Sequence, residues 1–171
     1  MNETEHVSGK EKYSTFFIAF KWILGIIEYG GGAYILYDYH LFAAIIYLAY
    51  VAVSGGVILP LASCVNCYYF GSKCHNAWGK VVSRIHSRGN TGNFAKTFPW
   101  RILLYPVWAL PLAGAAITLA RVRNQETAII VGIYIVILYV NHRLLMRYPA
   151  CRTCRQRFNC PGCQYKDYAV S

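Results

Sequence analysis

With 171 residues, the chain is short enough for one domain, but its composition excludes an ordinary soluble one. Hydrophobic residues make up 56% and charged residues 14%, where soluble domains have roughly 45–50% and 25%. The net charge is +10, but without a recognisable nucleic-acid-binding module we expect no nucleic acid partner. Basic residues on so apolar a chain orient it in a membrane and meet anionic lipid headgroups. The lipid bilayer is therefore the expected partner, and a protein partner or homo-oligomer stays open.

Four apolar segments approach the roughly 20 residues that a helix needs to cross about 30 Å of hydrocarbon. They cover residues 16–37, 41–61, 102–120 and 128–145. Pro106 and Pro111 fall inside the third segment, where neighbouring helices can satisfy the backbone groups that a proline frees. The first segment is too long for a signal-peptide core and lacks a cleavage site, so we expect a retained helix. The pattern predicts an all-α membrane protein with four transmembrane helices.

The connections predict how these helices are oriented. Those near residues 37–40 and 121–126 are short, so the four helices form two hairpins, whereas 62–101 and 146–171 are long and polar. Fourteen lysines and arginines lie with the N-terminus, the long loop and the tail, against Arg121 and Arg123 on the opposite side. The positive-inside rule then predicts a multi-pass protein of the cell membrane with a cytoplasmic N-terminus and C-terminus.

The predicted organisation has five parts. They are an N-terminal inside segment 1–15, a first transmembrane hairpin 16–61, a cysteine-rich inside loop 62–101, a second transmembrane hairpin 102–145 and a cysteine-rich inside tail 146–171. Within the loop, Trp78, Val81, Val82 and Ile85 recur at helical spacing. They predict a short amphipathic helix, either in the membrane interface or packed on the cysteines.

Each predicted hairpin is followed by a cysteine motif on the inner face, and all seven cysteines belong to these two motifs. The first is Pro60-x3-Cys64-x2-Cys67-x6-Cys74, and the second is Pro149-x-Cys151-x2-Cys154-x5-Cys160-x2-Cys163. The shared layout suggests an internal repeat. Because both halves begin inside, they would be parallel repeats related by an axis along the membrane normal. That symmetry would bring the two motifs together at the inner surface.

Metal binding accounts for more of the cysteines than its competitors do. Two residues between cysteines let both sulfurs meet one ion around a tight turn, and thiolates suit zinc or iron–sulfur clusters. Disulfides are disfavoured by a reducing compartment and an odd count, a dithiol redox pair uses only two thiols, and palmitoylated or free thiols remain open. We predict zinc, with an iron–sulfur cluster as the alternative, in one shared site or two. The candidate ligands are Cys64, Cys67, Cys74, His75, Cys151, Cys154, Cys160 and Cys163.

Glu28 is the other candidate site, because it lies at membrane depth in the first apolar segment. An intramembrane carboxylate marks a functional site by default. The competing interpretation is a hydrogen-bonded side chain that packs helices together, with a tyrosine as partner. Lys21, two turns earlier, is expected to snorkel to the inner surface. His142, at the end of the fourth segment, is either a metal ligand or a hydrogen-bonded interfacial histidine.

The stretch from Cys67 to Cys74, followed by Trp78-Gly79-Lys80, resembles small uncharacterised cysteine-rich membrane proteins of prokaryotes, and this resemblance implies no activity. The Asp-His-His-Cys motif of protein palmitoyltransferases is absent, and only a C-x2-C matches quinone-linked disulfide oxidoreductases. No catalytic or nucleotide-binding motif is visible. We therefore expect a non-catalytic membrane protein of accessory, assembly or scaffold type. A membrane redox protein is the alternative, followed by a metal-ion transporter with Glu28 in its path.

Overall fold

Four membrane-length helices dominate the structure. The computed structural model describes residues 12–122 and 125–163, in which the elements are all helical. Four stretches are long and apolar enough to cross a membrane: Thr15–Tyr39, Leu41–Cys64, Thr91–Arg121 and Gln125–Leu145. They confirm the four predicted spans, and each is longer than the segment predicted from the sequence. Phe42 and Ile46, each 66% exposed, belong to the apolar outer surface of the bundle, which a bilayer would cover with lipid.

The first two spans are joined by a single residue. Helix α1 (Thr15–Tyr39) begins after Ser14, whose hydroxyl accepts a hydrogen bond from the amide of Phe17, a standard N-cap. His40 has an extended backbone, and its Nδ1 accepts from the amide of Phe42 at the start of α2 (Leu41–Val53). His40 therefore ends one helix and caps the next. The second span continues through two π-helical stretches, η1 (Ser54–Ile58) and η2 (Pro60–Cys64).

The remaining elements build the other two spans and the connections between them. A short helix α3 (Trp78–Val82) lies in the long loop. Next come η3 (Thr91–Asn93), α4 (Phe94–Thr97) and η4 (Phe98–Leu104), which lead into α5 (Pro106–Val122). Helix α6 (Gln125–Tyr139) continues into the π-helical η5 (Val140–Cys151), and η6 (Arg155–Asn159) follows. The second and fourth spans therefore each run on, through π-helical turns, to the first cysteine of a motif.

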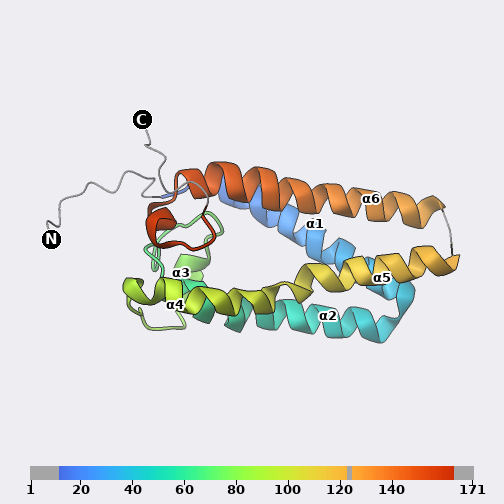
Figure 1. Ribbon diagram of the computed structural model, residues 1–171, viewed down its shortest axis with the longest axis horizontal. Coiled ribbons are helices and arrows are strands. Elements are labelled where there is room, and N and C mark those ends of the chain that lie inside the picture. Colours follow the sequence, from blue (N-terminus) through green and yellow to red (C-terminus); the bar gives the residue numbers. More distant parts are fainter. Residues whose placement is uncertain (1–11, 123–124, 164–171) are drawn as a thin grey trace, which may run out of the picture.

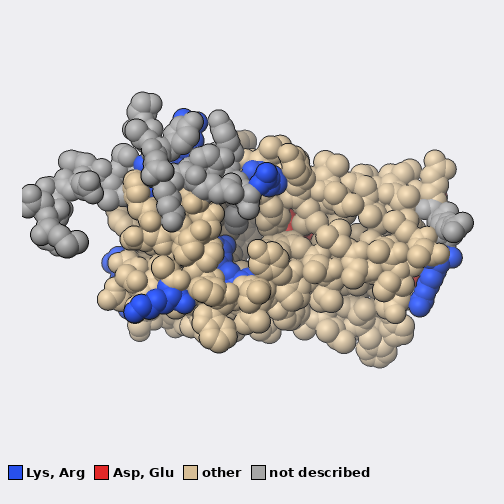
Figure 2. Space-filling model, in the orientation of Figure 1, with Lys and Arg blue, Asp and Glu red and all other residues tan. Residues whose placement is uncertain are grey.

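The arrangement places both cysteine motifs at one end of the bundle. Figure 1 shows α1, α2, α5 and α6 running side by side, with α3 and α4 at one end and the α1–α2 and α5–α6 connections at the other. Figure 2 shows Lys and Arg side chains gathered mainly at the end with α3 and α4. The predicted segments 1–15 and 146–171 fall partly outside the described residues. Three residues of the charge count, Lys10, Arg123 and Lys166, also lie outside them.

Close packing at Gly32 joins three spans in the middle of the bundle. A Cβ atom at this position of α1 would lie 2.7 Å from Tyr47 Oη on α2 and 2.9 Å from Pro111 Cγ on α5. Small residues at such contacts allow helix backbones to approach closely in a membrane. Gly32 thereby fixes how α1 sits against α2 and α5, and so positions the polar residues that α1 carries.

Candidate functional site

Hydrogen bonds attach the first cysteine motif to the second, although the two lie far apart in the sequence. The amide of Tyr68 donates to Gln156 Oε1 at 2.8 Å, and the amide of Arg155 donates to the Tyr69 hydroxyl at 3.1 Å. Tyr13, just before α1, donates from its hydroxyl to the carbonyl of Ala150 at 2.8 Å. Gln156, Tyr69 and Tyr13 are buried. The long loop, the tail and the start of α1 therefore form one packed unit.

This unit lines a partly open cavity of about 140 Å³, which we call the cysteine cavity. All eight side chains that the sequence singled out as metal ligands line it. The first motif contributes four of them and the second motif contributes the other four. The elements around the cavity are the ends of η2 and η5, the loop before α3, and the segment around η6. The eight lining candidates are Cys64, Cys67, Cys74, His75, Cys151, Cys154, Cys160 and Cys163.

The three C-x2-C pairs share one backbone turn. In each, the amide of the second cysteine donates to the carbonyl of the first, over 3.1–3.3 Å. The thiols of Cys67, Cys154 and Cys160 also accept a backbone hydrogen bond from the residue two positions later. Such a turn allows the two sulfurs of a pair to meet one ion. The paired residues are Cys64 with Cys67, Cys151 with Cys154, and Cys160 with Cys163.

Burial shifts the pKa values of several side chains around the cysteine cavity. It raises the pKa of Cys67 and of Cys151 to about 11, and that of Cys154 to about 12, with neighbouring cysteines adding to the rise. Burial, together with the cations of Lys21 and Arg101, lowers the pKa of His75 to about 3. These shifts favour neutral thiols at Cys67, Cys151 and Cys154 and a neutral imidazole at His75. Thiols of redox catalysts have the opposite shift, because the thiolate is their reactive form.

The first motif also depends on a glycine that spacing arguments overlook. The amide of Gly79 donates to Cys74 Sγ at 3.4 Å, and its carbonyl accepts from the amide of Gly71. A Cβ atom on Gly79 would lie 2.2 Å from the carbonyl oxygen of Tyr69. Only glycine allows this approach, so α3 packs directly on the loop that carries Cys74.

The cysteine cavity is not an assembled ligand set. Within residues 12–122 and 125–163, no group of three or more histidine, cysteine or acidic side chains is arranged to hold a metal ion. None of the seven cysteines, all of which lie in the described part of the chain, forms a disulfide. The structure thus brings the eight candidates to one cavity, and the bound metal stays a prediction.

The second candidate site centres on Glu28, which lies one residue beyond the midpoint of α1 and is 1% exposed. Its carboxylate accepts a hydrogen bond from Trp108 Nε1 at 2.6 Å and from Asn141 Nδ2 at 2.5 Å. His142 Nε2 lies 3.0 Å from the same carboxylate. Trp108 belongs to α5 and the other two residues to η5, so the Glu28 cluster ties three spans together at membrane depth.

The structure differs from the sequence-based expectation for Lys21 and decides between the two interpretations of His142. Lys21 does not snorkel out of the bundle; it is 6% exposed and lines a cavity between the helices. His142 lies beside Glu28 and is not among the residues that line the cysteine cavity. From the sequence we expect a tyrosine as the hydrogen-bond partner of Glu28, and neither Trp108 nor Asn141 is predicted. The one feature of the sequence that points to these partners is the polar pair Asn141-His142 at the end of the fourth apolar segment.

Comparisons with protein-family models, with curated proteins and with solved structures found no match to this chain.

Proposed function

We propose that this chain is a non-catalytic membrane protein of accessory, assembly or scaffold type, whose cytoplasmic face is organised by structural zinc at the cysteine cavity. One observation carries the proposal: three C-x2-C pairs with the same backbone turn, together with Cys74 and His75, surround a single cavity. Thiolates and a neutral imidazole are the donors that structural zinc sites use. The depressed pKa of His75 keeps its imidazole unprotonated at neutral pH.

The eight candidate ligands fit the demand of zinc in number as well as in kind. A structural zinc ion takes about four ligands, so seven cysteines and His75 would hold about two ions. When bound, zinc would cross-link the loop to the tail, and its binding free energy would become folding free energy for both segments. The small aromatic and aliphatic core there, centred on Tyr13, Tyr69 and Ala150, is the kind of core that often needs a metal staple.

The proposed arrangement is two parallel hairpins, each followed by one motif on the inside. Two features support the duplication. The second and fourth spans both continue into π-helical stretches, and these stretches end at Cys64 and Cys151, the first cysteine of each motif. Each motif then opens with the same C-x2-C turn. The excess of lysine and arginine in the loop and tail supports a cytoplasmic location for this end of the bundle. Both termini would then lie on the cytoplasmic side of the cell membrane.

Chelation tests the structural role of the metal. Treating the purified, detergent-solubilised chain with a strong zinc chelator is expected to expose the cysteine motifs to protease, because the loop and tail lose their cross-link. Far-ultraviolet circular dichroism should change little, since the spans are held by their own helix packing. Re-addition of zinc should restore protection. Unchanged protease resistance after complete metal removal would contradict the structural role.

A membrane redox protein is the second candidate, and the number of thiols favours it. Seven cysteines line one cavity, and four cysteine thiolates are the usual ligand set of an iron–sulfur cluster. An iron–sulfur centre would give visible absorbance that bleaches on reduction, whereas zinc is colourless. A colourless, iron-free preparation would reject the iron–sulfur form. Dithiol chemistry is less favoured, because burial raises the pKa of Cys67, Cys151 and Cys154.

A further inference from the structure

A second, larger cavity of about 410 Å³ lies between the helices beside the Glu28 cluster, and we call it the membrane cavity. It is lined by residues of all four spans and by Asn76 and Trp78 of the long loop. Ile26 of α1, at its rim, is 66% exposed, and Gly56 of η1 is exposed as well. The membrane cavity therefore opens toward lipid between the first and second spans.

The charges around the membrane cavity have one sign. Lys21 and Arg101 line it, and none of the described residues in its wall is acidic. Lys21 is 6% exposed, and within the described part of the chain its ammonium group has no hydrogen-bond or ion-pair partner. Glu28 is a neighbouring charge outside the wall, and its carboxylate is hydrogen-bonded by Trp108, Asn141 and His142. An ammonium group that faces a largely apolar cavity without a counter-ion is costly, and an anion in the cavity would lower that cost.

The depth of the cavity matches the boundary between headgroups and acyl chains. Lys21 lies six residues, or roughly 9 Å, into α1, just below the end of the bundle that carries the cysteines. Trp22 and Trp78 are in ring contact at this level, with centroids 5.8 Å apart, and tryptophan prefers that interface. Deeper in the cavity Val51, Leu104 and Val107 make most of the wall apolar, and Ser54, Asn141 and His142 are polar residues among them.

We infer that the membrane cavity binds an anionic phospholipid, whose phosphate lies between Lys21 and Arg101 and whose acyl chain follows the apolar wall toward the Glu28 cluster. Basic pockets between transmembrane helices are suited to phosphate headgroups. A neutral amphiphile such as a quinone would also fit apolar and aromatic walls, but it would leave both cations without a counter-charge. The inference needs no metal at the cysteines, although Arg101, Asn76 and Trp78 line both cavities.

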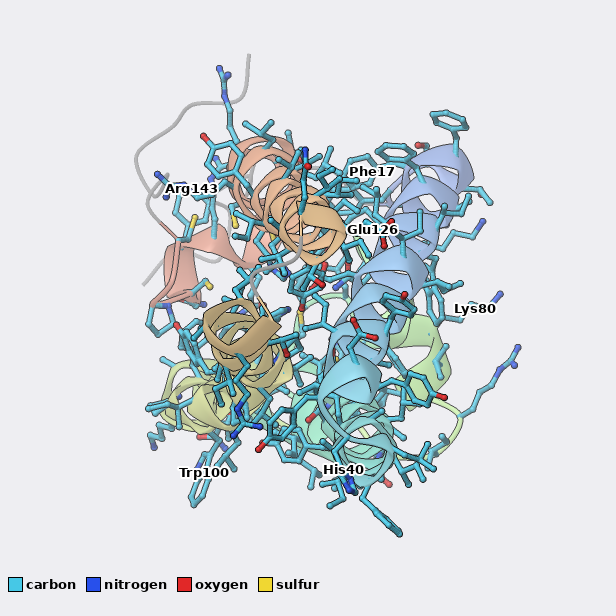
Figure 3. The ribbon with its side chains drawn as sticks, turned by 90° about the vertical axis from the view of Figure 1, so that its right-hand side faces the viewer. Phe17, His40, Lys80, Trp100, Glu126 and Arg143 are labelled. Atoms are coloured by element: carbon cyan, nitrogen blue, oxygen red, sulfur yellow. The ribbon has the colours of Figure 1, made fainter. Side chains whose placement is uncertain are left out.

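Tryptophan fluorescence can report occupancy, because Trp22, Trp78 and Trp108 line the cavity. Trp100, the fourth, is 64% exposed and points away from the bundle (Figure 3). The full chain with Trp100→Phe would be placed in phosphatidylcholine vesicles that contain a small fraction of brominated phosphatidylglycerol, and separately of brominated phosphatidylcholine. We expect stronger quenching by the anionic lipid, with a preference of about fivefold for each cation that contacts the phosphate.

Matched variants test whether Lys21 and Arg101 contact the lipid phosphate. Lys21→Met should lose about fivefold of the preference, and Lys21→Arg should keep it. Lys80→Met removes the same charge from an exposed side chain of α3 that points away from the bundle (Figure 3), and should have no effect. If Lys21→Met does not fold, Arg101→Gln makes the same test. Equal quenching by both lipids, or an unchanged preference in Lys21→Met, would overturn the proposal. Relief of quenching by inorganic phosphate, or displacement by a neutral short-chain quinone, would overturn it in favour of those ligands.

Discussion

Replacing Cys154 by serine is expected to remove about one metal ion per chain and to release the tail from the loop. Cys154 packs against the core around Tyr69 and begins the turn that places η6. A structural zinc ion needs about four ligands and contributes folding free energy, so the loss of one thiolate empties a site. Without a metal, the same change would cost only about 1–2 kcal/mol of packing. Elemental analysis and limited proteolysis of the tail measure the two effects.

Asn159→Ser is the matched control for this substitution. It also introduces a serine into the second motif, but at an exposed position directly before Cys160. Its metal content and protease resistance should equal those of the unaltered chain. If Cys154→Ser kept its full metal content, Cys154 would not be a ligand. If it lost metal without any loosening of the tail, the metal would not be structural.

Glu28→Ala is expected to lower the free energy of unfolding in detergent micelles by about 3–5 kcal/mol, since it removes a buried hydrogen-bonded carboxylate and leaves its partners unpaired. Trp108 Nε1 and Asn141 Nδ2 would lose their acceptor, and His142 would lose its hydrogen-bond partner. The three spans that meet at this point would lose their polar connection. Denaturant unfolding, followed by circular dichroism, measures the change.

Two further variants separate charge from shape. Glu28→Gln keeps an acceptor oxygen of the same reach, so it should cost about 1–2 kcal/mol. Asp38→Ala removes an acidic side chain from an exposed position in the last turn of the same helix. It should change stability by less than about 0.5 kcal/mol. A value for Glu28→Ala as small as that for Asp38→Ala would show that the Glu28 cluster does not hold the bundle together.

The membrane spans were predictable because each is a local property of the chain. A run of apolar residues of sufficient length has one stable form in a bilayer, a helix, whatever its neighbours are. The predicted segments are too short wherever the helix extends beyond the apolar residues. The third span starts at Thr91, but Lys96 and Arg101 interrupt the apolar pattern before residue 102. The π-helical turns before Cys64 and Cys151 leave no periodic signature in so short a stretch.

The partners within the two candidate sites were less predictable, because they come from different helices. Cysteine spacing identified the ligand candidates and suggested that the motifs meet, but not which turn each pair forms. Glu28 drew attention as a carboxylate at membrane depth. Its partners Trp108 and Asn141 follow 80 and 113 residues later, and only the rotation of α5 and η5 brings them to it. The burial of Lys21 likewise depends on a cavity that no single helix forms.

The metal content of the purified chain tests the central proposal most directly. The full-length protein, extracted from membranes without chelator, would be analysed for zinc and iron per chain, with a parallel titration of accessible thiols. We predict about two zinc ions per chain, no stoichiometric iron, and thiols that react only after the metal is removed. A metal-free chain whose loop and tail still resist protease would contradict the proposal, and iron with matching acid-labile sulfide would favour the redox alternative.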